Sequence, residues 1–216
     1  MNTKQSIQTR LAAVGVIPII RIDNAEKALR IAEAILRGGI PCLEVTLTTP
    51  GALGVIGGLA SEYGGQFLIG AGTVLDAESA RAAIDAGATF IVSPNTRRET
   101  LELCRRHGVV SCPGALTPTE IVTAWEQGGD LIKVFPVDNM GGARYIRALK
   151  APLPQIDLVP TGGIDLGNVA EHITAGATAV AVGSSLMDRK LIEAGDWAGI
   201  ATQAARFVAA VAQARG

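Results

Sequence analysis

The chain has 216 residues and a formal net charge of −1 at pH 7, with 48% hydrophobic and 18% charged residues. This composition predicts a substantial hydrophobic core and argues against a disordered chain. The charge leaves no basic surface for nucleic acid or for an anionic membrane, although a local site could still bind a phosphorylated metabolite. No apolar stretch is long enough to span a bilayer.

The first 15 residues form a polar, amphipathic pattern that predicts a short helix and has no features of a secretory signal. Apolar runs typical of buried parallel strands then alternate with longer helical patterns. The strand-like runs cover residues 16–21, 42–47, 67–71, 89–93, 109–112, 130–136, 156–160 and 179–183. The helical patterns cover residues 25–37, 51–61, 77–86, 98–106, 118–126, 143–149, 166–175 and 197–214.

Eight strand–helix units predict an α/β fold, a single compact (β/α)8 TIM barrel over residues 1–216 with a short N-terminal helix. An open doubly wound sheet is the alternative, but the glycine-rich turn of its dinucleotide-binding form is absent after the first strand. Asp76, Thr117 and Asp165 occupy expected N-cap positions. Glycines after residues 37, 86 and 107 suit left-handed helix ends.

Three cysteines, Cys42, Cys104 and Cys112, form an odd number without paired spacing. They predict free thiols in a reducing cytoplasm. The chain has two histidines, His107 and His172, and neither lies near another ligand-type residue in the sequence. This arrangement argues against a histidine-rich metal site.

Lys133 lies in the middle of the apolar run 130–136. If the run is a strand, Lys133 and Phe135 share one face. The ammonium could reach water at the strand end or pair with a carboxylate. Alternatively, the lysine is held as the neutral amine that attacks carbonyl groups and forms Schiff bases.

Glu44 lies in a run where aliphatic and polar side chains alternate, from residue 43 to residue 48. The aliphatic face should pack on helices, so Glu44 is expected to point into the barrel. It could be a buried ion-pair partner of Lys133 or Arg21. It could also be a general acid/base whose pKa is raised by its surroundings.

Arg21 ends the first strand, where its planar guanidinium suits the carboxylate of a 2-oxo acid. The alternative is a structural arginine that pairs with Glu44 or with loop carbonyls. In the third strand, the glycines of residues 70–73 could let the backbone approach a ligand, and Thr73 offers a hydroxyl. Close packing of the barrel is the other explanation for these small residues.

Two glycine-containing loops follow the last two strands, at residues 160–165 and 183–185. Exposed backbone N–H groups and a helix N-terminus form an anion site. These are the positions at which many barrels bind phosphate. The two loops together therefore predict a phosphate site.

These motifs resemble those of the 2-keto-3-deoxy-6-phosphogluconate (KDPG) aldolases, a family that includes the phosphogalactonate and 4-hydroxy-2-oxoglutarate (KHG) aldolases. The matching motifs cover residues 17–20, 44–47, 70–74, 92–94, 112–114, 133–136, 160–164 and 182–184. The resemblance implies a metal-free class I aldolase without a cofactor, a cytoplasmic homotrimer. Its expected reaction is the reversible cleavage of KDPG, or of its galactonate C4 epimer, to pyruvate and D-glyceraldehyde 3-phosphate.

The resemblance also implies residue roles. Lys133 falls on the Schiff-base lysine and Glu44 on the proton-shuttling glutamate. The expected substrate-binding residues are Arg21, Thr73, Pro94, Phe135 and Thr161. The expected phosphate-binding residues are Gly162, Gly163, Gly183 and Ser184.

Two positions depart from the pattern. Thr48 stands where many members have an arginine, and Arg21 on the adjoining strand could supply the guanidinium instead. Asn95 stands where many members have glycine and is more similar to the phosphogalactonate branch. The preferred epimer therefore stays open.

Four alternatives also stay open. The main activity could be that of a KHG aldolase. The chain could be a metal-dependent pyruvate aldolase, which needs a glutamate–aspartate pair, or a phosphosugar isomerase or epimerase. It could also be a non-catalytic barrel that binds a phosphorylated metabolite, with Lys133 and Glu44 as a structural ion pair.

Overall fold

The computed structural model describes residues 3–22 and 24–216 of the chain. The strands are β1 Val16–Ile20, β2 Cys42–Thr46, β3 Leu68–Gly72, β4 Phe90–Val92, β5 Val110–Cys112, β6 Gly114–Ala115, β7 Ile132–Val134, β8 Leu158–Pro160 and β9 Val180–Val182. The α-helices are α1 Lys4–Val14, α2 Ala25–Arg37, α3 Ala52–Tyr63, α4 Ala77–Asp85, α5 Arg98–His107, α6 Pro118–Glu126, α7 Ala143–Lys150, α8 Val169–Thr174, α9 Arg189–Ala194 and α10 Trp197–Arg215. Two 3-10 helices are η1 Gly64–Gln66 and η2 Asp138–Met140.

All eight predicted strands and all predicted helices are present, with ends that differ by a few residues. The caps at Asp76 and Thr117 are confirmed, since their side chains accept hydrogen bonds from backbone N–H groups in the first turns of α4 and α6. The cap predicted at Asp165 is wrong: α8 begins later, with Asn168 at its N-cap position. The Asp165 side chain instead accepts a hydrogen bond from the Gly167 N–H at 2.7 Å and closes a turn ahead of the helix.

The strands form two parallel sheets, with orders β5-β4-β3-β2-β1-β9 and β6-β7-β8. The larger sheet curls into a half-barrel. Only Pro113 separates β5 from β6, and because proline has no N–H to donate, it interrupts the ladder there. On the other side of the smaller sheet, one parallel bridge joins Thr161, after β8, to Ala181 in β9. The sequence predicted one continuous barrel, and the hydrogen-bonded ladder is instead divided at these two places.

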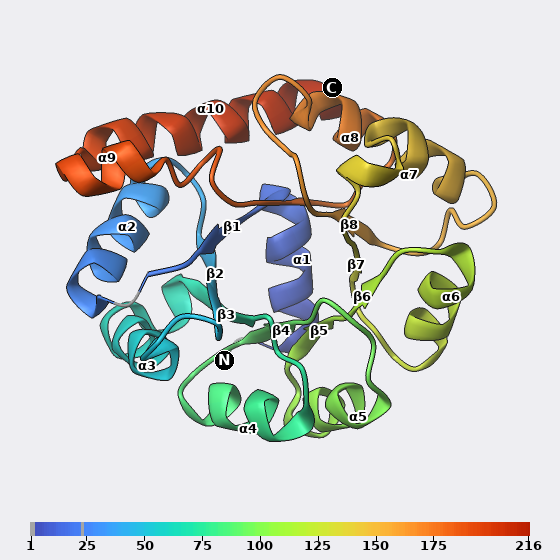
Figure 1. The fold of residues 1–216 in the computed structure, drawn as a ribbon, viewed down its shortest axis with the longest axis horizontal. Helices are drawn as coiled ribbons and strands as arrows, with labels where there is room; N and C mark the ends of the chain where they lie inside the picture. Colours follow the sequence, from blue (N-terminus) through green and yellow to red (C-terminus); the bar gives the residue numbers. More distant parts are fainter. Residues whose placement is uncertain (1–2, 23) are drawn as a thin grey trace.

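Helix α1 lies at the centre of the view in Figure 1, with the strands around it and the other helices outside. Its Ile7 and Leu11 are buried in the core. Lys4 of α1 forms an ion pair of 2.9 Å with Asp130, the residue that begins the predicted lysine strand. Gln8 donates a hydrogen bond to the backbone carbonyl of the same Asp130. Helix α1 therefore covers the end of the fold where the strands begin, and the opposite end remains for a functional site.

The two ends of the chain are joined by Arg215. Its guanidinium donates hydrogen bonds to the carbonyls of Ala12 and Ala13 in α1, and to that of Thr178 just before β9. Strand β1 also pairs with the last strand, β9, over three residues that begin with Val16 opposite Val180. The first and last elements of the sequence are therefore neighbours in the fold.

The three cysteines are free, as predicted, and the structure shows that all three are buried. Burial raises the pKa of Cys104 to about 11 and that of Cys112 to about 12, and it raises the pKa of Cys42 further. Because the thiolate is the nucleophilic form, none of the three is activated for attack at neutral pH. Within the part of the chain that the structure describes, no helix is long and apolar enough to cross a membrane.

Candidate active site

Lys133 is held inside the fold at the middle of β7. Only 6% of its surface is exposed, and its ammonium nitrogen lies 5.1 Å from the centre of the Phe135 ring. The predicted alternation, which placed Lys133 and Phe135 on one face, is consistent with this contact. None of the ion pairs found in residues 3–22 and 24–216 includes Lys133. Lys133 therefore neither reaches water freely nor pairs directly with a carboxylate.

Glu44 lies on β2 and is 1% exposed. Among the residues that the structure describes, its buried Oε2 has no hydrogen-bond partner, and no side-chain nitrogen of Lys133 or Arg21 forms an ion pair with it within 4 Å. Burial raises the pKa of Glu44, and the nearby charges of Lys133 and Arg21 oppose this rise. The carboxyl group is thus buried near two basic side chains without a direct ion pair to either.

The glycines of β3 face neighbouring side chains. A Cβ atom on Gly72 would collide with Oε1 of Glu44 and would lie 2.5 Å from its Cδ. A Cβ on Gly70 would collide with the Phe90 ring. The absence of side chains at Gly70 and Gly72 leaves the space that the Phe90 ring and the Glu44 side chain occupy. This is the packing explanation that the sequence left open.

Thr73 follows β3 with an unusual backbone conformation. Its φ of 57° is the only positive φ of a non-glycine residue in the described part of the chain. A β-branched residue is strained in this left-handed region, and such strain is concentrated at functional sites. Because β3 ends at Gly72, the alternation of side chains along the strand does not determine where the Thr73 side chain lies.

The two predicted phosphate loops meet at one cavity of about 360 Å³. Its lining includes Arg21, Phe135, Thr161, Gly162, Gly163, Gly183 and Ser184. Gly162 and Gly163 have φ values of 108° and 67°, which favour glycine. A Cβ on Gly183 would lie 3.9 Å from Nη1 of Arg21. Glycine backbone and one guanidinium therefore line a space that suits an anion; Asp165 also lines it, and one of its carboxylate oxygens accepts a hydrogen bond from the Gly167 N–H.

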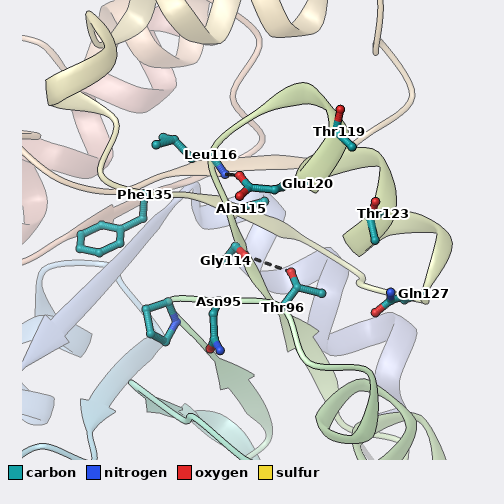
Figure 2. Close-up of a pocket in the computed structure, with 11 residues that line it drawn as sticks. Asn95, Thr96, Gly114, Ala115, Leu116, Thr119, Glu120, Thr123, Gln127 and Phe135 are labelled. Atoms are coloured by element: carbon teal, nitrogen blue, oxygen red, sulfur yellow. Dashed lines mark hydrogen bonds between the residues drawn. The ribbon is translucent and has the colours of Figure 1, made fainter.

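A second cavity, of about 470 Å³, lies on the side of α6. Figure 2 shows Phe135 at one end of it, with its ring pointing away from α6, and Thr123 and Gln127 at the other end. Pro94 lines this cavity, whereas Thr161 lines the first cavity with Gly162 and Gly163, which we call the glycine-lined cavity. The predicted substrate-binding residues Pro94 and Thr161 therefore line different cavities. Phe135 itself lines both.

Sequence reasoning missed most of the residues that line this second cavity. They are Thr96, Gly114, Ala115, Leu116, Thr119, Glu120, Thr123 and Gln127. Some are engaged locally: Thr96 donates to the carbonyl of Gly114, and Glu120 accepts hydrogen bonds from the Leu116 and Thr117 amides. The sequence signal of Thr117 and Glu120 is that of a capping box, which predicts a helix start and not a cavity.

Of the residues that the structure describes, no three or more His, Cys, Asp or Glu side chains are grouped so that they could hold a metal ion. His172 is buried on α8, away from the other histidine, and burial lowers its pKa.

The family model for KDPG and KHG aldolases matches residues 7–203 of the chain. The chain belongs to the KDPG and KHG aldolase family. A 2-dehydro-3-deoxy-phosphogluconate aldolase of Treponema pallidum is 39% identical over 187 residues, 87% of this chain and 89% of the relative. A 2-dehydro-3-deoxy-6-phosphogalactonate aldolase of Escherichia coli is 36% identical over 180 residues, 83% of this chain and 86% of the relative.

A solved structure adds chemical detail for a family member. The KDPG aldolase of Legionella pneumophila, captured with pyruvate as a covalent carbinolamine intermediate, superposes with a TM-score of 0.85. It is 33% identical, and the match covers 92% of this chain and 96% of that chain. Within the KDPG and KHG aldolase family, this chain is thus about as similar to a protein named for the gluconate substrate as to one named for the galactonate substrate.

Proposed function

We propose that this chain is a class I aldolase that reversibly cleaves KDPG, or its galactonate C4 epimer, to pyruvate and D-glyceraldehyde 3-phosphate. The observation that carries the proposal is the pair formed by Lys133 and Glu44. Both are almost fully buried, and the charge of Lys133 acts on the pKa of Glu44. Within residues 3–22 and 24–216, neither side chain forms a direct ion pair. A buried amine and a buried carboxyl group without such partners are unfavourable for stability, so their retention points to chemistry.

The reaction begins at Lys133. Its neutral amine attacks the C2 carbonyl of the 2-oxo acid and forms a carbinolamine, which loses water to give a cationic imine. Glu44 supplies and removes the protons of these steps, directly or through a bound water. The unpartnered Oε2 of Glu44 supports this role, because a proton carrier needs an oxygen that no protein group occupies.

Cleavage of the C3–C4 bond follows. Glu44 accepts the proton of the C4 hydroxyl, and the bonding electron pair moves toward the imine to form an enamine. Glyceraldehyde 3-phosphate leaves as the aldehyde. Protonation of the enamine at C3 and hydrolysis of the imine then release pyruvate and regenerate Lys133.

The phosphate binds in the glycine-lined cavity in this proposal. Backbone amides of Gly162, Gly163 and Gly183 and the Ser184 hydroxyl hold it, which orients the reacting carbons above Lys133. Thr161 lines the same cavity, Pro94 lines the second cavity, and Thr73 is not among the residues that line either one.

Gly163→Ala should selectively weaken phosphorylated substrates. The φ of Gly163 is positive, which disfavours any residue with a side chain. The added methyl carbon would also lie 2.7 Å from the Cβ of Asp138, so the loop must move. We expect KM for the phosphorylated substrate to rise at least about tenfold, the equivalent of one lost charge-assisted hydrogen bond. Trapping of the pyruvate imine with borohydride should stay near the wild-type level.

Gly58→Ala in α3 is the matched control, because a Cβ at that position would have open space around it. It should leave both measurements unchanged. An equal loss of pyruvate trapping and of phosphorylated substrate in Gly163→Ala would show that the loop supports the barrel in general and not the phosphate.

Arg21 supplies the guanidinium that many family members carry at the position of Thr48. Strands β1 and β2 are neighbours, with Ile19 opposite Glu44, so a side chain at either position can reach the same 2-oxo acid carboxylate. We expect Arg21→Ala and Arg21→Lys to lose roughly ten- to hundredfold in kcat/KM, because lysine lacks the bidentate fork. Pyruvate binding, measured by imine trapping, should weaken in both variants.

The double change Arg21→Val with Thr48→Arg should recover part of the activity. A different result is informative: unchanged pyruvate trapping with a loss confined to phosphorylated substrates would assign Arg21 to the phosphate, whose cavity it lines. A fall in melting temperature along with activity would make Arg21 a structural counter-ion of Glu44.

The proposed function as a whole is tested by a coupled pyruvate-release assay. The substrates are the gluconate and galactonate epimers and 4-hydroxy-2-oxoglutarate, each with and without EDTA. We expect EDTA-insensitive release from at least one phosphorylated epimer. Faster release from 4-hydroxy-2-oxoglutarate would favour the KHG activity, EDTA sensitivity would favour a metal-dependent aldolase, and no release would favour a binding barrel.

We further propose that the two sheets form one closed (β/α)8 barrel within a single domain of residues 1–216. The short breaks between the two sheets support this: one residue, Pro113, separates β5 from β6, and a parallel bridge links Thr161 to Ala181.

The resemblance to the family supports a homotrimer, which light scattering would test. Three buried free thiols support a reducing, cytoplasmic location.

A further inference from the structure

Glu44 and Gly72 occupy one space between neighbouring strands. Strands β2 and β3 pair over five residues, with Thr46 opposite Gly72. The Glu44 side chain leans along the strand toward its C-terminal end and lies over Gly72. A Cβ on Gly72 would collide with Oε1 and would lie 2.5 Å from Cδ and 2.7 Å from Cγ. Any side chain at position 72 would therefore overlap the carboxyl half of Glu44.

The backbone of Gly72 does not itself require glycine. Gly72 is not among the glycines with a positive φ, so an L-residue could adopt its conformation. Its carbonyl accepts a hydrogen bond of 2.8 Å from the Leu47 amide, which fixes it in the sheet. Because the strand cannot move aside, an added methyl group must displace Glu44.

We propose that Gly72 is a positioning residue for the aldolase reaction: its missing side chain is what allows the Glu44 carboxyl group to lie where it can exchange protons with the substrate. This inference rests on the proposed function of Glu44. A methyl group at position 72 pushes the carboxyl group away from its present place, and displacements of about 1 Å cost on the order of 10²-fold in rate. Imine formation by pyruvate depends first on Lys133, so it is less affected than C–C cleavage.

Gly70 offers a matched control on the same face of the same strand. A Cβ there would collide with the Phe90 ring, while no atom of Glu44 is among its nearest neighbours. Gly70 lies opposite Glu44 in the β2–β3 ladder, but the atoms nearest to its added methyl group belong to the Phe90 ring, so Gly70→Ala introduces a packing conflict that is directed first at Phe90. It should lower the melting temperature, and any loss of activity should be independent of the residue at position 44.

The experiment is a set of double-mutant cycles with kcat/KM for pyruvate release, the pH profile and melting temperature measured on every protein. Gly72→Ala alone should lower kcat/KM by about 10²-fold and shift the limb of the pH profile that belongs to Glu44. In the Glu44→Gln background, the same change should lower kcat/KM less than about threefold. Gly70→Ala should have the same effect in both backgrounds and leave the pH profile in place.

Glu44→Ala gives a second cycle that remains informative even if Gly72→Ala alone does not fold. The alanine side chain ends at Cβ and lacks the Cγ, Cδ and Oε1 atoms of Glu44 that the added methyl group would meet. In this background Gly72→Ala should fold and change kcat/KM less than about threefold. Failure to fold there, or equal multiplicative losses of Gly72→Ala in all backgrounds, would overturn the proposal.

The two proposals fail differently. If folded Glu44→Gln keeps the wild-type rate, the shuttle role of Glu44 is wrong and the present inference falls with it. If Glu44→Gln is inactive but Gly72→Ala is as active as the wild type, the shuttle role stands and only the positioning role of Gly72 is wrong.

Discussion

Lys133→Met should form no imine with pyruvate and should lose roughly 10⁴–10⁶-fold in kcat, the range expected when a covalent nucleophile is removed. Methionine is unbranched and apolar, so it can fill the space of Lys133 within a strand that is otherwise buried. Because the buried ammonium is removed, the variant should fold at least as stably as the wild type. The measurement is peptide mass after treatment with pyruvate and borohydride, which should find the reduced pyruvyl group on Lys133 of the wild type.

Lys150 is the appropriate control lysine. Burial lowers its pKa, so it is a competing amine, and its ammonium donates hydrogen bonds to the carbonyls of Pro154 and Ile156. Lys150→Met should keep both the label on Lys133 and the activity. A label found on the Lys150 peptide, or an active wild type without any label, would remove Lys133 from the mechanism.

Glu44→Gln should lower turnover by roughly 10²–10⁴-fold while raising the melting temperature at neutral pH. The rise follows from the sign of the pKa shift. Burial raises the pKa of Glu44 in the folded protein, so ionisation above the ordinary glutamate pKa of about 4.3 disfavours folding. Glutamine cannot ionise and avoids this penalty.

The stability difference should therefore be small near pH 4 and should grow as the pH rises toward the folded-state pKa of Glu44. For a chain of this size, each 1 kcal/mol corresponds to about 2–4 °C in melting temperature. The assay is thermal unfolding of both proteins from pH 4 to pH 8, together with kcat.

Glu120→Gln is a control with the opposite sign. Hydrogen bonds from the Thr117 and Leu116 amides lower the pKa of Glu120, so its carboxylate contributes stability at neutral pH that is lost in acid. Its replacement should lower the melting temperature at pH 7. If Glu44→Gln also lowers the melting temperature at pH 7, Glu44 is a structural ion-pair partner. If folded Glu44→Gln keeps the wild-type kcat, another group is the proton shuttle.

The alternation of side chains in strands explains what the sequence could predict. Lys133 and Glu44 stand out because each is the charged residue in a run that must be buried, and a period of two fixes the face on which each lies. Their burial was predictable in this way. The phosphate loops were predictable for a similar reason, since glycine pairs after the last two strands have a positional meaning in barrels.

The turn at Thr73, the contact of Glu44 with Gly72 and the two separate cavities depend on tertiary contacts, which the periodicity of the sequence does not predict. Thr73 follows β3 with a φ of 57°, so the alternation of the strand does not extend to its side chain. The lean of Glu44 over Gly72 depends on a side-chain rotamer and on the register of two strands. The division of the site into two cavities depends on where the Phe135 ring points, which the sequence does not determine.

The pairing of β1 with β9 has a consequence for how the chain folds as it is synthesised. The five residues of β1 are all buried in the folded protein. One edge of β1 pairs with β9, so that edge stays uncovered until Val180 and its neighbours have been synthesised. Arg215 binds the carbonyl of Ala12, 203 residues away, so this contact of α1 forms only when the last residues have been synthesised. Contacts this distant in sequence form slowly. Until they form, a nascent chain presents an apolar strand edge to its neighbours, and this is the stage at which a chaperone would be most useful.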